Sequence, residues 1–188
     1  TMFYNCAGLT TLDLSNFDTS SAISLTSMFQ YCSGLTTLDL SSFDTSNVTS
    51  VLRMVSSCTS LTTLDLSNFN TSNVNTMMQM FYGCTNLTSI DVTSFDTSNV
   101  VNMTQMFRNC LNLTSLDISN FDTSSVTGLG YMFSSCLNLT NLDIKHFDVS
   151  NVTDGTNFLL NANNALTTTQ YDELLEAWAE QDIQPNVP

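Results

Sequence analysis

Hydrophobic and polar positions recur along the chain with a period of 26 residues. Cysteine marks this period most plainly, and it occupies Cys6, Cys32, Cys58, Cys84, Cys110 and Cys136. Aliphatic residues recur at three further positions of every repeat, represented in the second repeat by Leu35, Leu38 and Leu40. A fixed period of about 20 to 50 residues is typical of a solenoid, in which each repeat is one unit stacked on the next. The six cysteines therefore mark one structural position that the chain visits six times.

The first half of each repeat predicts a β-strand. In residues 37–41 the leucines alternate with Thr37, Asp39 and Ser41, and such alternation places the two kinds of side chain on opposite faces of a strand. We expect strands near residues 11–15 and every 26 residues after that, paired in one parallel sheet. The turn that follows, residues 44–47 in the second repeat, consists of short polar residues. Their side chains accept hydrogen bonds from free backbone N–H groups.

The second half of each repeat predicts a short helix of two to three turns. The apolar residues of the fourth repeat recur at three- and four-residue steps, the spacing of one helix face: Val100, Met103, Met106, Phe107 and Cys110. Strands lie about 4.8 Å apart, whereas packed helices need about 8–10 Å, so the stack should curve with the sheet inside. The sequence therefore predicts an α/β fold, a curved right-handed leucine-rich-repeat solenoid with one parallel sheet on the concave face and short helices on the convex face.

The period ends near the C-terminus. Ala162 takes the cysteine position of a seventh repeat, and Thr169 and Asp172 then stand at the spacing of a capping box that opens a helix. Its apolar stripe is expected to comprise Tyr171, Leu174, Leu175 and Trp178. We divide the chain into six 26-residue leucine-rich repeats at 1–157 and a C-terminal capping half-repeat and helix at 158–188. Trp178 is expected to seal the open end of the solenoid, because a terminal repeat needs a different outer surface.

The consensus of these repeats, L-x-x-L-D-L-S-x-F-D-T-S-N-V-x-x-M-x-x-M-F-x-x-C, resembles a known family over about residues 1–160. It is similar to the 26-residue repeat of bacterial surface proteins, the BspA-like leucine-rich repeat. Where the usual leucine-rich repeat has an inward asparagine, this chain has phenylalanine, and we expect those rings to stack in a ladder: Phe17, Phe43, Phe69, Phe95, Phe121 and Phe147. The resemblance implies an extracellular or cell-surface bacterial protein, often an adhesin, and it supplies no catalytic residues.

The charge of the chain restricts its partners. It has 17 acidic and 3 basic residues, a net charge of −14, and eleven of the acids lie in just two columns of the repeat. Nucleic acid is an unsuitable partner because phosphate binding needs clusters of Lys and Arg. The sequence also contains no apolar stretch long enough for membrane insertion.

The cysteines and the histidine do not predict a disulfide framework, a metal site or a catalytic site. Equivalent cysteines on adjacent turns have parallel Cβ vectors, which favours buried free thiols over disulfides, and metal ligation is the third alternative. The chain has no CxxC motif, and His146 is its single histidine. A repeated Ser/His/Asp set is therefore excluded, and we predict a protein without catalytic activity, cofactor or metal site.

The predicted concave face carries the candidate binding residues. These outward residues are Thr37, Asp39, Ser41, Thr63, Asp65, Ser67, Asp91 and Asp117. Carboxylates about 5 Å apart repel by about 0.8 kcal/mol per neighbour even in water, so another interaction must offset that repulsion. Three interpretations stay open: a solvated face that keeps the solenoid soluble, a surface that binds a protein or glycan, and a column bridged by calcium.

The main functional hypothesis is a non-catalytic cell-surface or secreted bacterial protein that mediates adhesion or partner binding through the concave face. Its ligand would be a protein or glycan on another cell or in the matrix. The alternative is a structural spacer or a filament or fibre subunit with end-to-end self-association. A remote alternative is ice binding, which the Thr-x-Asp rows disfavour because matching to ice favours a flat Thr-x-Thr array.

Overall fold

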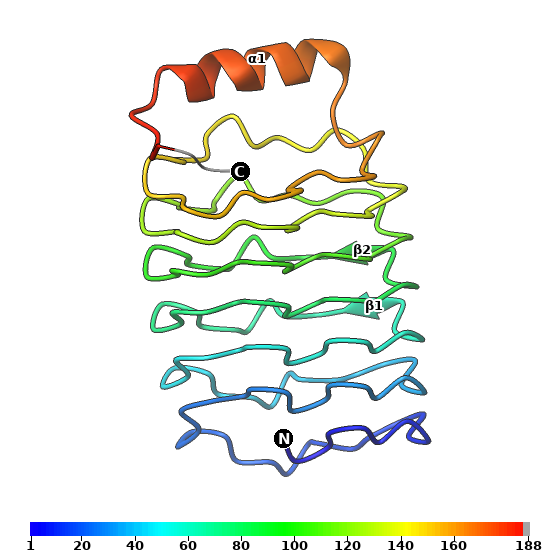
Figure 1. Ribbon diagram of the computed structural model, residues 1–188. Helices are drawn as coiled ribbons and strands as arrows, with labels where there is room; N and C mark the ends of the chain where they lie inside the picture. Colours follow the sequence, from blue (N-terminus) through cyan, green and yellow to red (C-terminus); the bar gives the residue numbers. More distant parts are fainter. Residues whose placement is uncertain (186–188) are drawn as a thin grey trace.

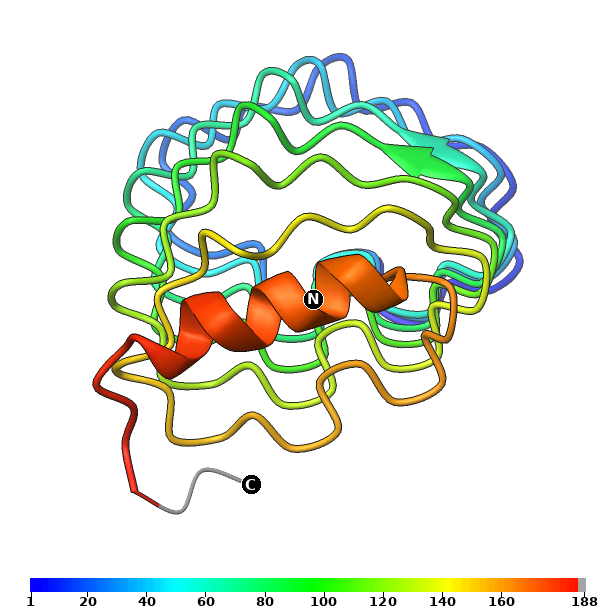
Figure 2. The ribbon, with the colours of Figure 1, turned by 90° about the horizontal axis from the view of Figure 1, so that it is seen from above.

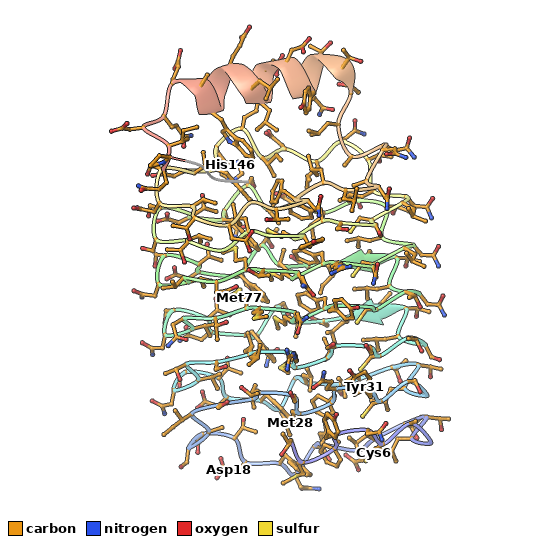
Figure 3. All side chains as sticks on the ribbon, in the orientation of Figure 1. Cys6, Asp18, Met28, Tyr31, Met77 and His146 are labelled. Atoms are coloured by element: carbon orange, nitrogen blue, oxygen red, sulfur yellow. The ribbon has the colours of Figure 1, made fainter. Side chains whose placement is uncertain are left out.

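The computed structural model describes residues 1–185, in which the chain forms a stack of coils with one coil for every repeat (Figure 1). Its regular elements are the strands β1 (Thr63–Leu64) and β2 (Ser89–Ile90) and the helix α1 (Thr168–Ala179). The two strands are parallel and pair Thr63 with Ser89 and Leu64 with Ile90. Seen along the stack, each coil is a flattened loop, and α1 lies across one end (Figure 2). The apolar residues fill the inside of the coils, as Met28 and Met77 do (Figure 3).

The prediction of a continuous parallel sheet is wrong, since two strands of two residues each are all that forms within residues 1–185. The aspartates explain why. The backbone N–H of Ser41 donates to Oδ1 of Asp39 at 2.9 Å, so this N–H is not available to a neighbouring coil. Each predicted strand thus ends in a local turn made by its own side chain. The burial pattern that predicted a strand is nevertheless observed, with Leu38 and Leu40 buried and Thr37 and Asp39 exposed.

The prediction of a helix in the second half of each repeat is also wrong. We call these stretches the Met–Phe segments, residues 24–33, 50–59, 76–85, 102–111 and 128–137. Gln105 and Asn109 have φ angles of 59° and 63°, which an α-helix of L-residues does not allow. Alternate N–H groups bond to the next coil instead, as Gln105 does to the Gly130 carbonyl at 2.9 Å. The others close four-residue turns, as Met106 does by donating to the Met103 carbonyl at 3.0 Å.

The hydrogen bonds between adjacent Met–Phe segments also remove the reason for which the stack was expected to curve. A helix would have pushed the coils about 8–10 Å apart on one side, whereas strand-like pairing needs about 4.8 Å. Parallel bridges join adjacent Met–Phe segments along the whole stack, linking Ser24, Ser50, Thr76, Asn102, Gly128 and Asp154 in order. Both long sides of the coil are therefore spaced for backbone pairing, and neither side is widened by helices. This protein is not a curved leucine-rich-repeat solenoid.

Phenylalanines of the Met–Phe segments form the stacked ladder. The rings of Phe81 and Phe107 lie 5.3 Å apart at 14°, and those of Phe107 and Phe133 lie 5.7 Å apart at 4°. The column predicted to stack, which includes Phe43 and Phe95, is buried, but no stacked pair forms within it among residues 1–185. The preceding column supplies polar contacts instead, since Asn120 Nδ2 donates to the Phe95 carbonyl at 2.6 Å.

The cap begins two residues earlier than the sequence predicts. Thr167 is the N-cap of α1 and forms a capping box with Gln170, so the box predicted at Thr169 and Asp172 is wrong. Leu174 is the buried residue of the helix, while Trp178 packs against Phe158 at 6.0 Å between ring centroids. Tyr171 and Leu175, expected in the apolar stripe, are about half exposed, at 49% and 48%. Within residues 1–185, no helix is long and apolar enough to cross a membrane.

Two glutamines after α1 complete the hydrogen bonds of the last coil. Gln181 accepts from the Val149 N–H at 2.6 Å and donates to the Phe147 carbonyl at 2.9 Å. Gln184 donates to the Ser150 carbonyl at 2.9 Å, as an asparagine of the next repeat does in earlier coils. Backbone groups that would otherwise be left open at the end of the stack are thus satisfied by side chains of the cap.

Candidate functional site on two exposed faces

The eight residues predicted to bind a partner are all exposed and lie on the side of the coils that carries β1 and β2. Their aspartates are held by residues two positions along the chain. Asp91 Oδ1 accepts from the N–H and the hydroxyl of Thr93 at 2.9 and 2.6 Å, and Asp117 accepts from Ser119 at 3.0 and 2.7 Å. Each carboxylate therefore stabilises a turn within its own coil.

These hydrogen bonds keep the aspartates ionised. The side-chain and then the backbone hydrogen bond from Ser41 lower the pKa of Asp39 from its ordinary value, and they outweigh the opposing effects of burial and of the neighbouring Asp13. The pKa of Asp91 and that of Asp117 are lowered in the same way. Local bonds thus offset the repulsion between neighbouring carboxylates. Within residues 1–185, no group of three or more His, Cys, Asp or Glu side chains is arranged to hold a metal ion.

The cysteines form a buried column of free thiols, as predicted. All six are free, and Cys6 of the first coil is the partly exposed one. The others reach back to the preceding coil, where Cys84 Sγ donates to the Val55 carbonyl and Cys110 Sγ to the Phe81 carbonyl, each at 3.2 Å. Burial raises the pKa of Cys84 to about 12. These thiols are therefore inert packing groups rather than nucleophiles.

A second face, which the sequence reasoning missed, lies on the Met–Phe side of the coils. We call it the Tyr–Arg face and define it as Tyr4, Gln30, Tyr31, Arg53, Gln79, Tyr82, Gln105, Arg108 and Tyr131. Its residues lie on successive coils and are exposed or partly exposed, apart from the buried Gln30, and it contains both arginines and four of the five tyrosines of the chain. The Tyr–Arg face therefore concentrates residue types that are rare elsewhere in this sequence.

The polar side chains of this face form a row across successive coils. Arg53 Nε donates to Gln79 Oε1, and Gln79 Nε2 donates to Gln105 Oε1 at 2.6 Å. The guanidinium carbon of Arg108 lies 4.5 Å from the ring centroid of Tyr131 and 6.0 Å from that of Tyr82. Such cation–π contacts hold a guanidinium in place without neutralising it.

Five residues of the Tyr–Arg face adopt an unusual backbone conformation. Their φ angles lie between 55° and 64°, a region that disfavours bulky side chains; they are Tyr31, Arg53, Gln79, Gln105 and Tyr131. Glycine or asparagine suits this geometry better, and Gly83 and Asn109 occupy the column of Tyr31 in other coils. The fold requires the conformation at these positions, but it does not require large side chains there.

The face surrounds a hollow of about 480 Å³ near the first coils. Tyr4, Tyr31 and Tyr82 line it together with Arg53 and Gln30. Gln30 is only 7% exposed, and its side-chain amide makes no hydrogen bond with any of residues 1–185. The amide atoms are not among the buried unpartnered ones, so they are accessible from the hollow and free to bind a ligand.

Charge is segregated between the two sides of the coil. The five Met–Phe segments contain no Asp or Glu, although the chain has 17, and they contain both arginines. The equivalent stretch of the last coil begins with one acid, Asp154, which pairs with Gly128. The third cation, Lys145, lies on the opposite side and pairs with Glu173 at 3.0 Å. This pattern of acids and arginines is visible in the aligned repeats, and it was the signal that could have predicted the Tyr–Arg face.

Two further features lie outside both faces. His146 Nε2 lies 3.1 Å from the Ile118 carbonyl, in the column where Asn120 bonds to the preceding coil, so it has a structural role. An apolar hollow of about 380 Å³ lies beneath α1, lined by Leu129, Phe158 and Trp178 among others. The indole N–H of Trp178 is buried and has no partner among residues 1–185.

Comparison with known proteins links the chain to one family. Residues 1–90 and 84–179 each match the family described as "Mycoplasma protein of unknown function, DUF285". The two matches span almost the whole chain and indicate a bacterial repeat protein, without singling out the BspA-like leucine-rich repeat. No curated protein matches the chain. No solved structure matches it either.

Proposed function

Because the chain belongs to this bacterial repeat family, we propose that it is a non-catalytic binding protein, secreted or displayed on the cell surface, that mediates adhesion. Its ligand is a protein or glycan on another cell or in the matrix, and the Tyr–Arg face makes the contact. The BspA-like resemblance of the repeat sequence favours this location and role. We place the binding surface there, and not on the rows of Thr, Asp and Ser on the side of β1 and β2, because the sheet predicted to form the concave face does not form and because those aspartates stabilise turns within their own coils.

The observation that carries the proposal is the pair of arginines without an acidic partner. Both arginines lie in a chain with 17 acids, yet the one ion pair among residues 1–185 is formed by Lys145. Arginine and tyrosine are enriched where proteins bind partners, and half-buried aromatic rings supply contact area at low entropic cost. The bulky residues at positive φ support the same conclusion, since the fold accepts small residues at these positions, as Gly83 and Asn109 show.

The test compares matched charge changes on the two sides of the coil. Beads coated with the protein are measured for retention on cultured cells and on immobilised matrix proteins. Arg53→Gln with Arg108→Gln should reduce retention at least tenfold, since loss of one charge-assisted contact costs about 1.5–3 kcal/mol. Lys145→Gln removes a positive charge from the other side and should leave retention unchanged.

A second variant separates the two faces. Changing Asp39, Asp65, Asp91 and Asp117 to Asn should leave retention intact. If this variant loses binding while the arginine variant keeps it, the Thr-Asp-Ser rows are the binding surface and the proposal for the Tyr–Arg face is wrong. If wild-type beads are retained on no cell or matrix protein, the adhesive role itself is contradicted.

The alternative is a spacer or fibre subunit, and the uninterrupted pairing of the coils favours it. Backbone bonds join the Met–Phe segments from Ser24 to Asp154 without a break, so the coils form a rigid rod that could hold another domain at a distance. Sedimentation velocity across a hundredfold concentration range tests the fibre form. A single species throughout this range excludes end-to-end assembly under those conditions.

A further inference from the structure

We propose that the ligand of the Tyr–Arg face is a carboxylated sugar, such as a uronic acid unit of an oligosaccharide. This inference rests on the proposed function and adds the chemical class of the ligand. It follows from three properties of the face: free guanidinium donors, aromatic rings at the rim of a hollow, and an unpaired amide within that hollow.

The guanidinium groups select for an acid. Arg53 uses its Nε for Gln79 and makes no other side-chain hydrogen bond with residues 1–185, which leaves its terminal nitrogens for a ligand. Arg108 Nε is buried and has no partner in the same range. A guanidinium binds a carboxylate through two parallel hydrogen bonds. Among the described residues, neither arginine has a carboxylate of this chain within 4 Å. A carboxylate that pairs with either arginine would therefore come from the ligand.

The rings select for a sugar. Tyr4 and Tyr31 are 49% and 43% exposed, and their rings meet edge to face at 5.7 Å. A pyranose ring has an apolar face of C–H groups, which suits an aromatic ring, and an edge of hydroxyls, which suits amides and hydroxyls. Gln30 supplies such an amide in the same hollow. Its volume of about 480 Å³ is within the range of small-molecule sites, about 300–1,000 Å³.

The net charge of −14 sets a condition on this ligand. The net negative charge of the protein repels anions at long range, but this repulsion is screened beyond about 8 Å at physiological salt. The Met–Phe segments contain no carboxylate, so an acid that reaches the face meets the two arginines at close range. A compact acid on a sugar ring meets this condition better than a highly charged polyanion, whose other charges would extend over the acidic parts of the surface.

The experiment titrates the full chain with tetragalacturonate and, in parallel, with its fully methyl-esterified form, by calorimetry. The two probes share ring geometry and differ in the carboxylates. We expect the acid to bind and the ester to bind at least tenfold more weakly. Arg53→Gln and Arg108→Gln should each weaken binding of the acid about tenfold or more. Tyr31→Ala should also weaken it, whereas Tyr31→Phe, which keeps the ring, should not.

Other outcomes contradict the inference in distinct ways. Equal binding of acid and ester overturns the role of the carboxylate, and equal binding of a tetraglutamate peptide overturns the role of the sugar. If no tetragalacturonate binds while the arginine variant still loses adhesion in the bead assay, the ligand class is wrong and the proposed function stands. Lys145→Gln is the control in every titration, and circular dichroism of each variant verifies that the coils are intact.

Discussion

The buried hydroxyl of Thr71 holds the backbone of Asp96 in the next coil by two hydrogen bonds. Thr71 Oγ1 accepts from the Asp96 N–H at 2.8 Å and donates to the Asp96 carbonyl at 2.9 Å. Thr71 is 1% exposed, so water cannot replace it. The same threonine recurs once per coil and donates to the following coil in each case, at Thr19, Thr45, Thr71, Thr97 and Thr123.

Removing this hydroxyl should destabilise the stack far more than shortening the side chain. Thr71→Val is close to isosteric but leaves the backbone N–H and carbonyl of Asp96 without partners, at a cost of about 1–3 kcal/mol for each group. Thr71→Ser keeps both bonds, loses a methyl and should cost about 1 kcal/mol. Urea unfolding followed by circular dichroism measures both. Equal losses for the two variants would mean that packing, rather than the hydrogen bonds, is what Thr71 contributes.

The buried cysteines should not react with thiol reagents in the folded protein. Because burial raises the pKa of Cys84 to about 12, and raises that of Cys110 well above its ordinary value, a thiol reagent at pH 8 should label at most the partly exposed Cys6. In denaturant without reductant, all six thiols should react. A lower count under those conditions would reveal disulfides and contradict the free column.

Core truncations should rank by the size of the cavity that they leave. Cys84→Ala removes one sulfur from a fully buried site and should cost about 1 kcal/mol. Phe95→Ala removes a ring that is 2% exposed and should cost about 3–5 kcal/mol. Unfolding free energies from the same urea experiment provide the comparison, and a larger loss at Cys84 than at Phe95 would contradict this packing.

Acid should weaken the fold through the aspartate turns. The folded-state pKa of Asp39, Asp91 and Asp117 lies below the ordinary 3.8 because each accepts hydrogen bonds from residue i+2. The stability from such groups is present above pH 3.8 and is lost as the pH falls through the lowered folded values. Thermal melts should therefore change little from pH 7 to pH 5 and drop steeply below about pH 4. A steep loss between pH 7 and pH 5 would point to another titrating group.

The aspartates on the side of β1 and β2, Asp39, Asp65, Asp91 and Asp117, should be replaceable by asparagine. Asn70 already occupies an aspartate position of the turn column, and its Oδ1 accepts from the Ser72 N–H and hydroxyl at 3.1 and 2.7 Å. The variant with Asn at 39, 65, 91 and 117 should keep the fold, lose part of the acid transition, and melt at an unchanged or slightly higher temperature as mutual repulsion disappears. A chelator should leave its melting temperature and that of the wild type unchanged. A chelator-induced drop in the wild type alone would support calcium in the column.

The cap should unfold first when Gln181 is changed. Gln181→Met keeps the length of the side chain but leaves the Val149 N–H and the Phe147 carbonyl without their partner, which should cost about 1–3 kcal/mol for each buried group. Trp178 is the only tryptophan, so its fluorescence reports this end of the stack. We expect the fluorescence transition of the variant to precede the circular dichroism transition, while the wild type shows coincident ones. Gln170→Met, which changes the capping box instead, is the matched control.

Much of the molecule could be predicted from the repeats alone. The alternation of residues 37–41 correctly predicted which side chains are buried, and the apolar spacing of Val100, Met103 and Cys110 did the same, since all three are 0% exposed. The helix at the C-terminus and the free thiols were predicted too. The Tyr–Arg face could not be predicted from positions that carry the same residue type in every repeat. Arg53, Arg108 and the tyrosines occupy positions where the residue type differs from repeat to repeat.

By itself, the sequence determined the period of 26 residues, the columns that are buried, and the segregation of acids from arginines, because each of these depends only on residue type and spacing. Only the tertiary structure decided the shape of the Met–Phe segments and hence of the stack. Apolar residues at three- and four-residue steps suit a helix, and they suit equally a segment with two left-handed residues that turns its side chains inward. The choice depends on where the backbone N–H groups find acceptors, and in this protein the carbonyls of the adjacent coil provide them.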